Sequence, residues 1–281
     1  MGKALQLSFI CWLLSACSSL YVRAPSPNAG DIVASSPLFL KWHAAGFTHG
    51  IWRNKALKEL SDQQKQSSVD QLNIYIHGDG RPWLKPGTIA VDPSPNYSLT
   101  WALFLNDPRP SLFISRPCYF EGHKLDQNCS PTLWTNARYS ADIVASLKNT
   151  VSEALNQQQA NAINLVGFSG GGALAMLVAA ELDRDIEHLL SVKTIAANLD
   201  HQAWAEHHDY SPLSLSLNPR DLEPLEVEQI HFCGAHDSNI PLSILDAFFA
   251  RQGVACRIVD AQHERGWLKK WPALSGTLGS P

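Results

Sequence analysis

Residues 161–182 read NAINLVGFSGGGALAMLVAAEL, and this stretch decides the fold. Its beginning, 161–166, predicts a buried strand, and its end, 173–182, predicts a strongly apolar helix. Between them lies Gly167-Phe168-Ser169-Gly170-Gly171, in which a serine has a glycine two positions before it and another two positions after it. A chain that passes directly from a strand into a helix must turn sharply, so the residues on either side of the serine have to be small. The pattern therefore predicts a serine held on a tight, strained turn.

Apolar strand patterns and helical patterns alternate along the rest of the chain. Such alternation predicts an α/β fold with a mostly parallel central sheet and helices on both faces. No domain boundary is visible within 37–281, and the proline-containing segment 201–226 is expected to be a short insertion after the strand that follows the serine's helix. Strands are expected at 38–42, 72–77, 111–115, 161–166, 189–197, 230–233 and 256–259, and helices at 99–105, 140–158, 173–182, 241–249 and 267–274.

The Gly-x-Ser-x-Gly pattern matches the nucleophile elbow of α/β hydrolases, in which an acid and then a histidine follow the serine along the chain. A phosphate-binding loop is excluded, because no Lys-Ser or Lys-Thr pair follows the glycines. The segment 161–182 is thus expected to present Ser169 as a nucleophile, with the N-terminus of the following helix favouring negative charge beside it.

The expected partners of Ser169 lie after two later strands. Asp237 follows the strand at 230–233, and His263 follows the last strand, so both are expected at the same sheet edge as the serine. A histidine there would take the serine proton, and the acid would hold the ring. Asp200, after the preceding strand, is the alternative acid, whereas Asp237 is also a good helix N-cap.

Two backbone N–H groups are expected to form an oxyanion hole. One belongs to Gly170, immediately after the nucleophile. The other belongs to Asp79 in His77-Gly78-Asp79-Gly80, which resembles the HGGG-type motif except for its carboxylate. That carboxylate must point away from the oxyanion or pair with a cation, for which Arg81 is the candidate.

Together these features resemble the α/β-hydrolase superfamily across residues 72–267. The chain is also similar to a group of bacterial lipoprotein hydrolases. The resemblance implies hydrolysis of a carboxylic ester through an acyl-enzyme on Ser169, with a small-molecule acyl substrate and no cofactor.

The short insertion favours small or medium acyl groups. Thioester, amide or peptide cleavage by the same residues, or a non-catalytic binding role, are the alternatives. The lipoprotein similarity rests on His77–Gly80, Arg116-Pro117-Cys118, Cys129 with Trp134, and Asp200-His201 with Trp204.

The N-terminus reads as a targeting segment. Lys3 precedes a short apolar stretch that is too short to span a bilayer and ends in Leu14-Ser15-Ala16-Cys17. This tetrapeptide resembles a bacterial lipobox, which implies removal of residues 1–16, lipid on Cys17 and a tether over 17–36. Ser18 after the cysteine implies the outer membrane, facing the periplasm.

The cysteines, the net charge and the histidine spacing bear on disulfides, nucleic-acid binding and metal sites. Of six cysteines, one leaves with the signal peptide and one carries lipid, so an even number remains for disulfides in an exported protein. Cys118 and Cys129 bracket a polar loop and are expected to pair, whereas Cys233 and Cys256 are either bridged or free. A net charge of −4 gives no reason to expect nucleic-acid binding. No histidine or cysteine spacing indicates a metal site.

Overall fold

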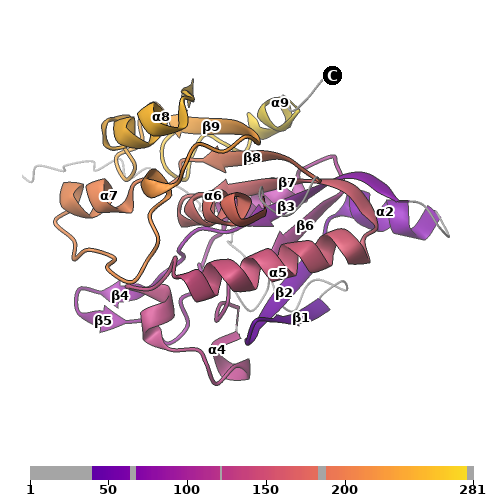
Figure 1. Ribbon diagram of the computed structural model, residues 1–281, viewed down its shortest axis with the longest axis horizontal. Coiled ribbons are helices and arrows are strands. Elements are labelled where there is room, and N and C mark those ends of the chain that lie inside the picture. Colours follow the sequence, from indigo (N-terminus) through magenta and orange to yellow (C-terminus); the bar gives the residue numbers. More distant parts are fainter. Residues whose placement is uncertain (1–39, 64–67, 121, 183–187, 277–281) are drawn as a thin grey trace, which may run out of the picture.

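The computed structural model describes residues 40–63, 68–120, 122–182 and 188–276 (Figure 1). The expected signal peptide at 1–16, Cys17 and the tether at 17–36 lie outside the described residues. Within the described part of the chain, none of the helices combines the length and the hydropathy that crossing a bilayer requires.

An eight-stranded, mostly parallel sheet forms the centre of the fold, in the order β1-β2-β6-β3-β7-β8-β9-β10. The first two pairings, β1 with β2 and β2 with β6, are antiparallel, and the others are parallel. The carboxyl ends of the parallel strands therefore meet at one edge. The strands are β1 (Leu40–Ala44), β2 (Phe47–Arg53), β3 (Val69–Ile76), β6 (Ser111–Ile114), β7 (Ala160–Phe168), β8 (Leu189–Ile195), β9 (Glu228–Gly234) and β10 (Cys256–Val259).

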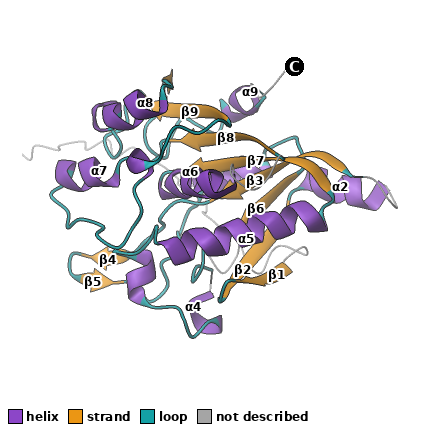
Figure 2. Ribbon diagram, in the orientation of Figure 1, coloured by secondary structure: helices purple, strands orange, loops and turns teal. Residues whose placement is uncertain are grey.

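Helices cover both faces of the sheet, as the alternating pattern predicts (Figure 2). In β3, Ile74 and Ile76 pack in one apolar cluster with α5, α6 and α8, whereas Tyr75 packs in a second cluster with α3 and α9. Alternate side chains of a strand point to opposite faces, so one strand feeds both clusters. The helices are α2 (Lys55–Gln63), α3 (Leu99–Leu105), α4 (Gly122–Leu125), α5 (Ala141–Gln157), α6 (Gly170–Leu182), α7 (His201–His207), α8 (Asp246–Gln252) and α9 (Trp271–Ser275).

Several elements differ from the expectation. The strand β2, the helix α2 and a small hairpin of β4 (Trp83–Lys85) and β5 (Thr88–Ile89) have no counterpart among the predicted elements. The helix expected at 241–249 begins only at Asp246, because a separate 3₁₀ turn at Leu242–Ile244 precedes it. The C-terminal helix begins at Trp271 rather than at residue 267.

Two disulfides fasten the described part of the chain. Cys118 is joined to Cys129, as predicted, and closes a loop of 11 residues. Cys233 on β9 is joined to Cys256 on the neighbouring strand β10, which decides the alternative that the sequence left open.

Candidate active site

Ser169 lies on the turn between β7 and α6, with a positive φ of 52°. This backbone conformation is strained for a residue with a side chain. A Cβ atom on Gly167 would collide with the carbonyl oxygen of Gly171, and one on Gly171 would collide with the carbonyl oxygen of Ile76. Both positions are therefore restricted to glycine by close backbone approach, which is the steric reason for the motif.

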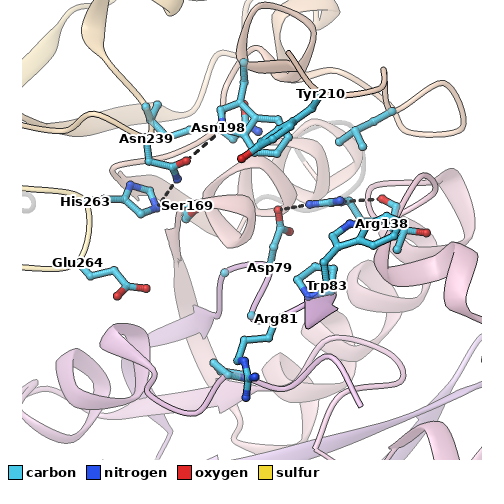
Figure 3. Close-up of a pocket in the computed structure, with 18 of the residues that line it drawn as sticks. Asp79, Arg81, Trp83, Arg138, Ser169, Asn198, Tyr210, Asn239, His263 and Glu264 are labelled. Atoms are coloured by element: carbon cyan, nitrogen blue, oxygen red, sulfur yellow. Dashed lines mark hydrogen bonds and ion pairs between the residues drawn. The ribbon is translucent and has the colours of Figure 1, made fainter. Parts of the chain in front are cut away.

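A chain of hydrogen bonds connects Ser169 to a histidine and a carboxylate. Figure 3 shows Ser169 and His263 side by side in the cleft. The Nε2 atom of His263 lies 3.1 Å from the Oγ atom of Ser169. The Nδ1 atom of His263 lies 2.9 Å from the Oδ2 atom of Asp237. The other oxygen of Asp237 accepts the backbone N–H groups of Asn239 and Ile240 at 2.9 and 2.8 Å. The carboxylate is therefore fixed in place, and it can hold the Nδ1–H tautomer that leaves Nε2 free to accept a proton.

The alternative acid, Asp200, has a different place in the structure. It is the N-cap of α7, where one oxygen accepts the backbone N–H groups of Gln202 and Ala203. Its other oxygen accepts a hydrogen bond from Arg220 at 3.2 Å. The structure thus brings Asp237, and not Asp200, to His263.

The loop after β3 lies beside the nucleophile. A Cβ atom on Gly78 would come within 3.3 Å of the Cβ atom of Ser169, so the loop and the turn are in near contact. The backbone N–H of Gly170 is the first of α6 and has no carbonyl one turn earlier to bind. The backbone N–H of Asp79 makes no hydrogen bond to another backbone group in the described part of the chain. Both groups that the sequence nominates as oxyanion donors are therefore available for a ligand.

The carboxylate of Asp79 is paired, but not with the residue that the sequence suggested. Arg81 instead donates to Asn96 at 2.6 Å. The partners of Asp79 are Arg116, whose Nη1 lies 2.6 Å from Oδ1, and Arg138, whose Nη1 lies 3.0 Å from Oδ2. The prediction of Arg81 is wrong because Gly80, with a positive φ of 65°, turns the chain between the two residues. The true partners come from other segments, Arg116 after β6 and Arg138 before α5.

A tyrosine completes this buried cluster. The hydroxyl of Tyr139 donates to Oδ2 of Asp79 at 2.7 Å. Burial by itself raises the pKa of Asp79, but the charges of Arg138 and Arg116 outweigh it and hold that pKa well below its usual range. The cluster thus carries one negative and two positive charges, so the carboxylate beside the oxyanion donors is more than neutralised.

His77 supports the same loop as a neutral ring. Its Nδ1 lies 2.8 Å from the carbonyl oxygen of Gly78, and its Nε2 accepts the backbone N–H of Arg116 at 3.1 Å. Burial, aided by the charge of Arg116, lowers the pKa of His77 to about 3. A neutral His77 donates at one nitrogen and accepts at the other, and both positions are used.

Asn239 touches the histidine, which the sequence did not indicate. Its Nδ2 lies 3.0 Å from Nε2 of His263, and the indole N–H of Trp204 lies 3.4 Å from its Oδ1. Because an indole can only donate, this contact orients the carbonyl of Asn239 toward Trp204 and its amide N–H toward His263. The backbone carbonyl of Asn239 also receives a hydrogen bond from His208 at 2.8 Å. The insertion therefore reaches the histidine through one residue.

A cleft of about 1330 Å³ opens above Ser169. Trp83, at the β4–β5 hairpin, and Tyr210, in the insertion, lie on its wall (Figure 3). Trp204 of the insertion also lines the cleft. Among the described residues, no group of three or more His, Cys, Asp or Glu side chains is arranged to hold a metal ion.

No protein-family model matches the sequence, and comparison with curated protein sequences finds no match either. Solved structures do resemble the chain. An α/β serine hydrolase homologue from Coxiella burnetii has a TM-score of 0.56 at 11% identity, covering 87% of this chain and 98% of that chain. An esterase from Pyrococcus furiosus has a TM-score of 0.56 at 10% identity, covering 85% and 89%. Est1E from Butyrivibrio proteoclasticus has a TM-score of 0.52 at 12% identity, covering 84% and 95%. The chain therefore has the α/β-hydrolase fold.

Proposed function

We propose that this protein is a serine hydrolase that cleaves a carboxylic ester through an acyl-enzyme on Ser169. The observation that carries the proposal is the hydrogen-bond chain from Asp237 through His263 to Ser169, at the floor of a cleft. A serine hydroxyl is a weak nucleophile unless a base stands beside it, and backbone strain of the kind seen at Ser169 clusters at functional sites.

In the proposed reaction, Nε2 of His263 accepts the proton of Ser169 while Oγ attacks the substrate carbonyl carbon. The carbonyl oxygen becomes negative and binds the N–H groups of Gly170 and Asp79. His263 then gives its proton to the departing alcohol, which leaves an acyl group on Ser169. In the second half of the reaction, His263 accepts a proton from water while the water oxygen attacks this ester. His263 then returns the proton to Oγ of Ser169 as the acid leaves. Throughout, Asp237 stabilises the charged ring.

Two neighbours bear on these steps. The amide of Asn239 and the hydroxyl of Ser169 both point at the single lone pair of Nε2, so Asn239 must turn or withdraw when that nitrogen takes up a proton. The paired arginines at Asp79 keep its carboxylate from opposing the negative oxygen.

The choice of an ester as substrate rests on similarity to solved structures and not on the catalytic residues. The same residues would cleave a thioester, an amide or a peptide, and the fold hosts many chemistries. The Pyrococcus furiosus structure described above is named as an esterase, which favours an ester first.

The test is labelling with a fluorophosphonate probe and turnover of p-nitrophenyl esters of increasing acyl length. The full-length protein in detergent is compared with Ser169→Ala and with Ser211→Ala, a serine that lines the same cleft. Labelling and turnover are expected to disappear in Ser169→Ala and to persist in Ser211→Ala. A folded wild-type protein that neither labels nor turns over any ester would favour the non-catalytic binding role.

We also propose that the mature protein is held by lipid on Cys17 in a bacterial cell envelope, at the outer membrane facing the periplasm. The support is the lipobox-like sequence at 14–17 and the two disulfides, which form in oxidising compartments. Metabolic labelling with a clickable palmitate analogue is expected to mark the wild type and not Cys17→Ser. Equal labelling of both would remove the proposal.

A further inference from the structure

The β4–β5 hairpin presents large apolar side chains to solvent at the mouth of the cleft. Trp83 is 46% exposed and Leu84 is 56% exposed, and Ile89 and Val91 are 38% and 76% exposed. Trp83, Lys85 and Gly87 line the cleft itself. We call these four apolar residues, 83, 84, 89 and 91, the hairpin patch. Trp83 and Ile89 are paired across the hairpin, and exposed apolar residues that gather on one small element mark an interaction surface rather than scattered surface residues.

The opposite rim of the cleft is apolar as well. Tyr210 is 54% exposed and lines the cleft, and Leu215 is 57% exposed. The backbone of Leu215 contacts Asn136, which is another residue of the cleft wall. In Figure 1 the chain after α7 descends toward the β4–β5 hairpin, and residues of both segments line the same cleft. Exposed apolar side chains therefore lie on two segments that line the cleft, the hairpin and the insertion.

The charges on the hairpin have one sign. Arg81 and Lys85 are both exposed, and no acidic residue occurs from 80 to 91. The acidic side chains of the cleft wall, Asp209 and Glu264, come from other elements. A tryptophan and aliphatic residues flanked by cations have the composition of segments that insert at an anionic lipid surface.

The base of the hairpin is fixed while its outer face is free. Ala90 is buried; its N–H donates to the carbonyl of Pro82 at 2.9 Å, and its carbonyl accepts the indole N–H of Trp134 at 3.0 Å. The N–H of Arg81 donates to the carbonyl of Pro93 at 2.7 Å. A surface that is already ordered loses little conformational entropy when it binds.

We propose that the hairpin patch docks on an anionic phospholipid surface. Its apolar side chains enter the boundary between headgroups and acyl chains, and Arg81 and Lys85 contact lipid phosphates. The entrance of the cleft then faces the lipid. If the proposed hydrolase function holds, the substrate is an acyl ester drawn from that layer. Docking itself does not require the nucleophile.

The test is cosedimentation with vesicles of phosphatidylcholine alone or enriched in phosphatidylglycerol. Every described element lies in residues 40–276, so a chain that begins at residue 18 keeps the fold and lacks the lipid-modified cysteine. Leu84→Ser is compared with Ile258→Ser, because Ile258 on β10 is 55% exposed but does not line the cleft. Leu84→Ser is expected to weaken binding to anionic vesicles by about tenfold, and Ile258→Ser to leave it unchanged.

Two further variants separate the contribution of charge, and the loss of hydrolysis, from docking by the hairpin patch. Lys85→Gln is expected to weaken binding to anionic vesicles and not to phosphatidylcholine alone. Ser169→Ala is expected to bind as the wild type does, so loss of hydrolysis and loss of docking are distinct results. The proposal is overturned if the wild type does not bind anionic vesicles, or if Leu84→Ser binds as well as Ile258→Ser. A dimer in solution that Leu84→Ser disperses, without vesicle binding, would assign the patch to a second copy of the chain instead.

Discussion

Replacement of Asp79 by asparagine tests the buried charge cluster beside the nucleophile. Three donors converge on this carboxylate: Arg116 on one oxygen, and Arg138 with Tyr139 on the other. An asparagine keeps only one acceptor oxygen. In either orientation its amide N–H₂ faces at least one arginine, so a donor meets a donor. The side chain of Arg116 is 1% exposed and that of Arg138 is 7% exposed, so neither can turn to water without moving its surroundings.

The expected magnitude follows from this burial. Removing one partner of a buried ion pair costs about 3–5 kcal/mol, because the remaining charge stays buried without compensation. For a chain of this length, that loss lowers the melting temperature by about 10 °C. The matched control is Asp221→Asn, since Asp221 is 66% exposed and pairs with Arg220 at 3.2 Å. An exposed pair of this kind is expected to change the unfolding free energy by less than about 1 kcal/mol.

Urea unfolding followed by circular dichroism measures both variants against the wild type. The pKa of Asp79 is held well below its usual range, so its stabilising contribution is present above about pH 4 and is lost as the pH falls toward the folded-state value. The difference between wild type and Asp79→Asn should therefore shrink in acid. If Asp79→Asn and Asp221→Asn lower the unfolding free energy equally little at pH 7, the charge cluster does not stabilise the fold and the reasoning is refuted.

Three further predictions follow from the same structure. Asp237→Asn keeps the shape of the acid but favours the wrong tautomer of the histidine, so kcat should fall by roughly 10³–10⁴-fold with little change in KM; a loss under tenfold would argue against its assignment. Replacing Cys118 and Cys129 by serine frees an 11-residue loop and should lower the unfolding free energy by about 3 kcal/mol, seen as a lower urea midpoint; an unchanged midpoint would contradict this. Burial lowers the pKa of His49 and of His231 from 6.5 to about 4, so the unfolded chain binds more protons between these values. Stability should therefore decline as the pH falls from about 6.5 to about 4, by on the order of 3 kcal/mol for each histidine, and His231→Gln should flatten the decline.

The local features of the chain were predictable because each leaves a periodic or steric signal. The segment 161–182 contains its own strand, turn and helix, and the glycines at 167 and 171 are required by contacts within a few residues or with the adjacent strand. The alternation of strands and helices predicted a mostly parallel sheet, since short connections and right-handed crossovers leave few other arrangements. Asp237 and His263 could be nominated because they follow strands whose carboxyl ends must share one edge.

Elements without such a signal were missed. The strand β2 contains His49 and Gly50, which interrupt its apolar pattern, although the structure buries both residues. The β4–β5 hairpin consists of only five strand residues and exposes most of them, so neither burial nor alternation reveals it. Its apolar surface becomes meaningful only when its position at the mouth of the cleft is known.

The sequence by itself determined the turn that presents Ser169, the order of acid and base, the class of fold and one of the two disulfides. Only the tertiary structure decided which carboxylate meets His263, that Asn239 reaches the same nitrogen, and that Asp79 is neutralised by Arg116 and Arg138. The physical reason is separation along the chain: these arginines lie 37 and 59 residues from Asp79. Contacts over such distances follow no period and no motif, because they arise where the sheet and its loops bring separate segments together.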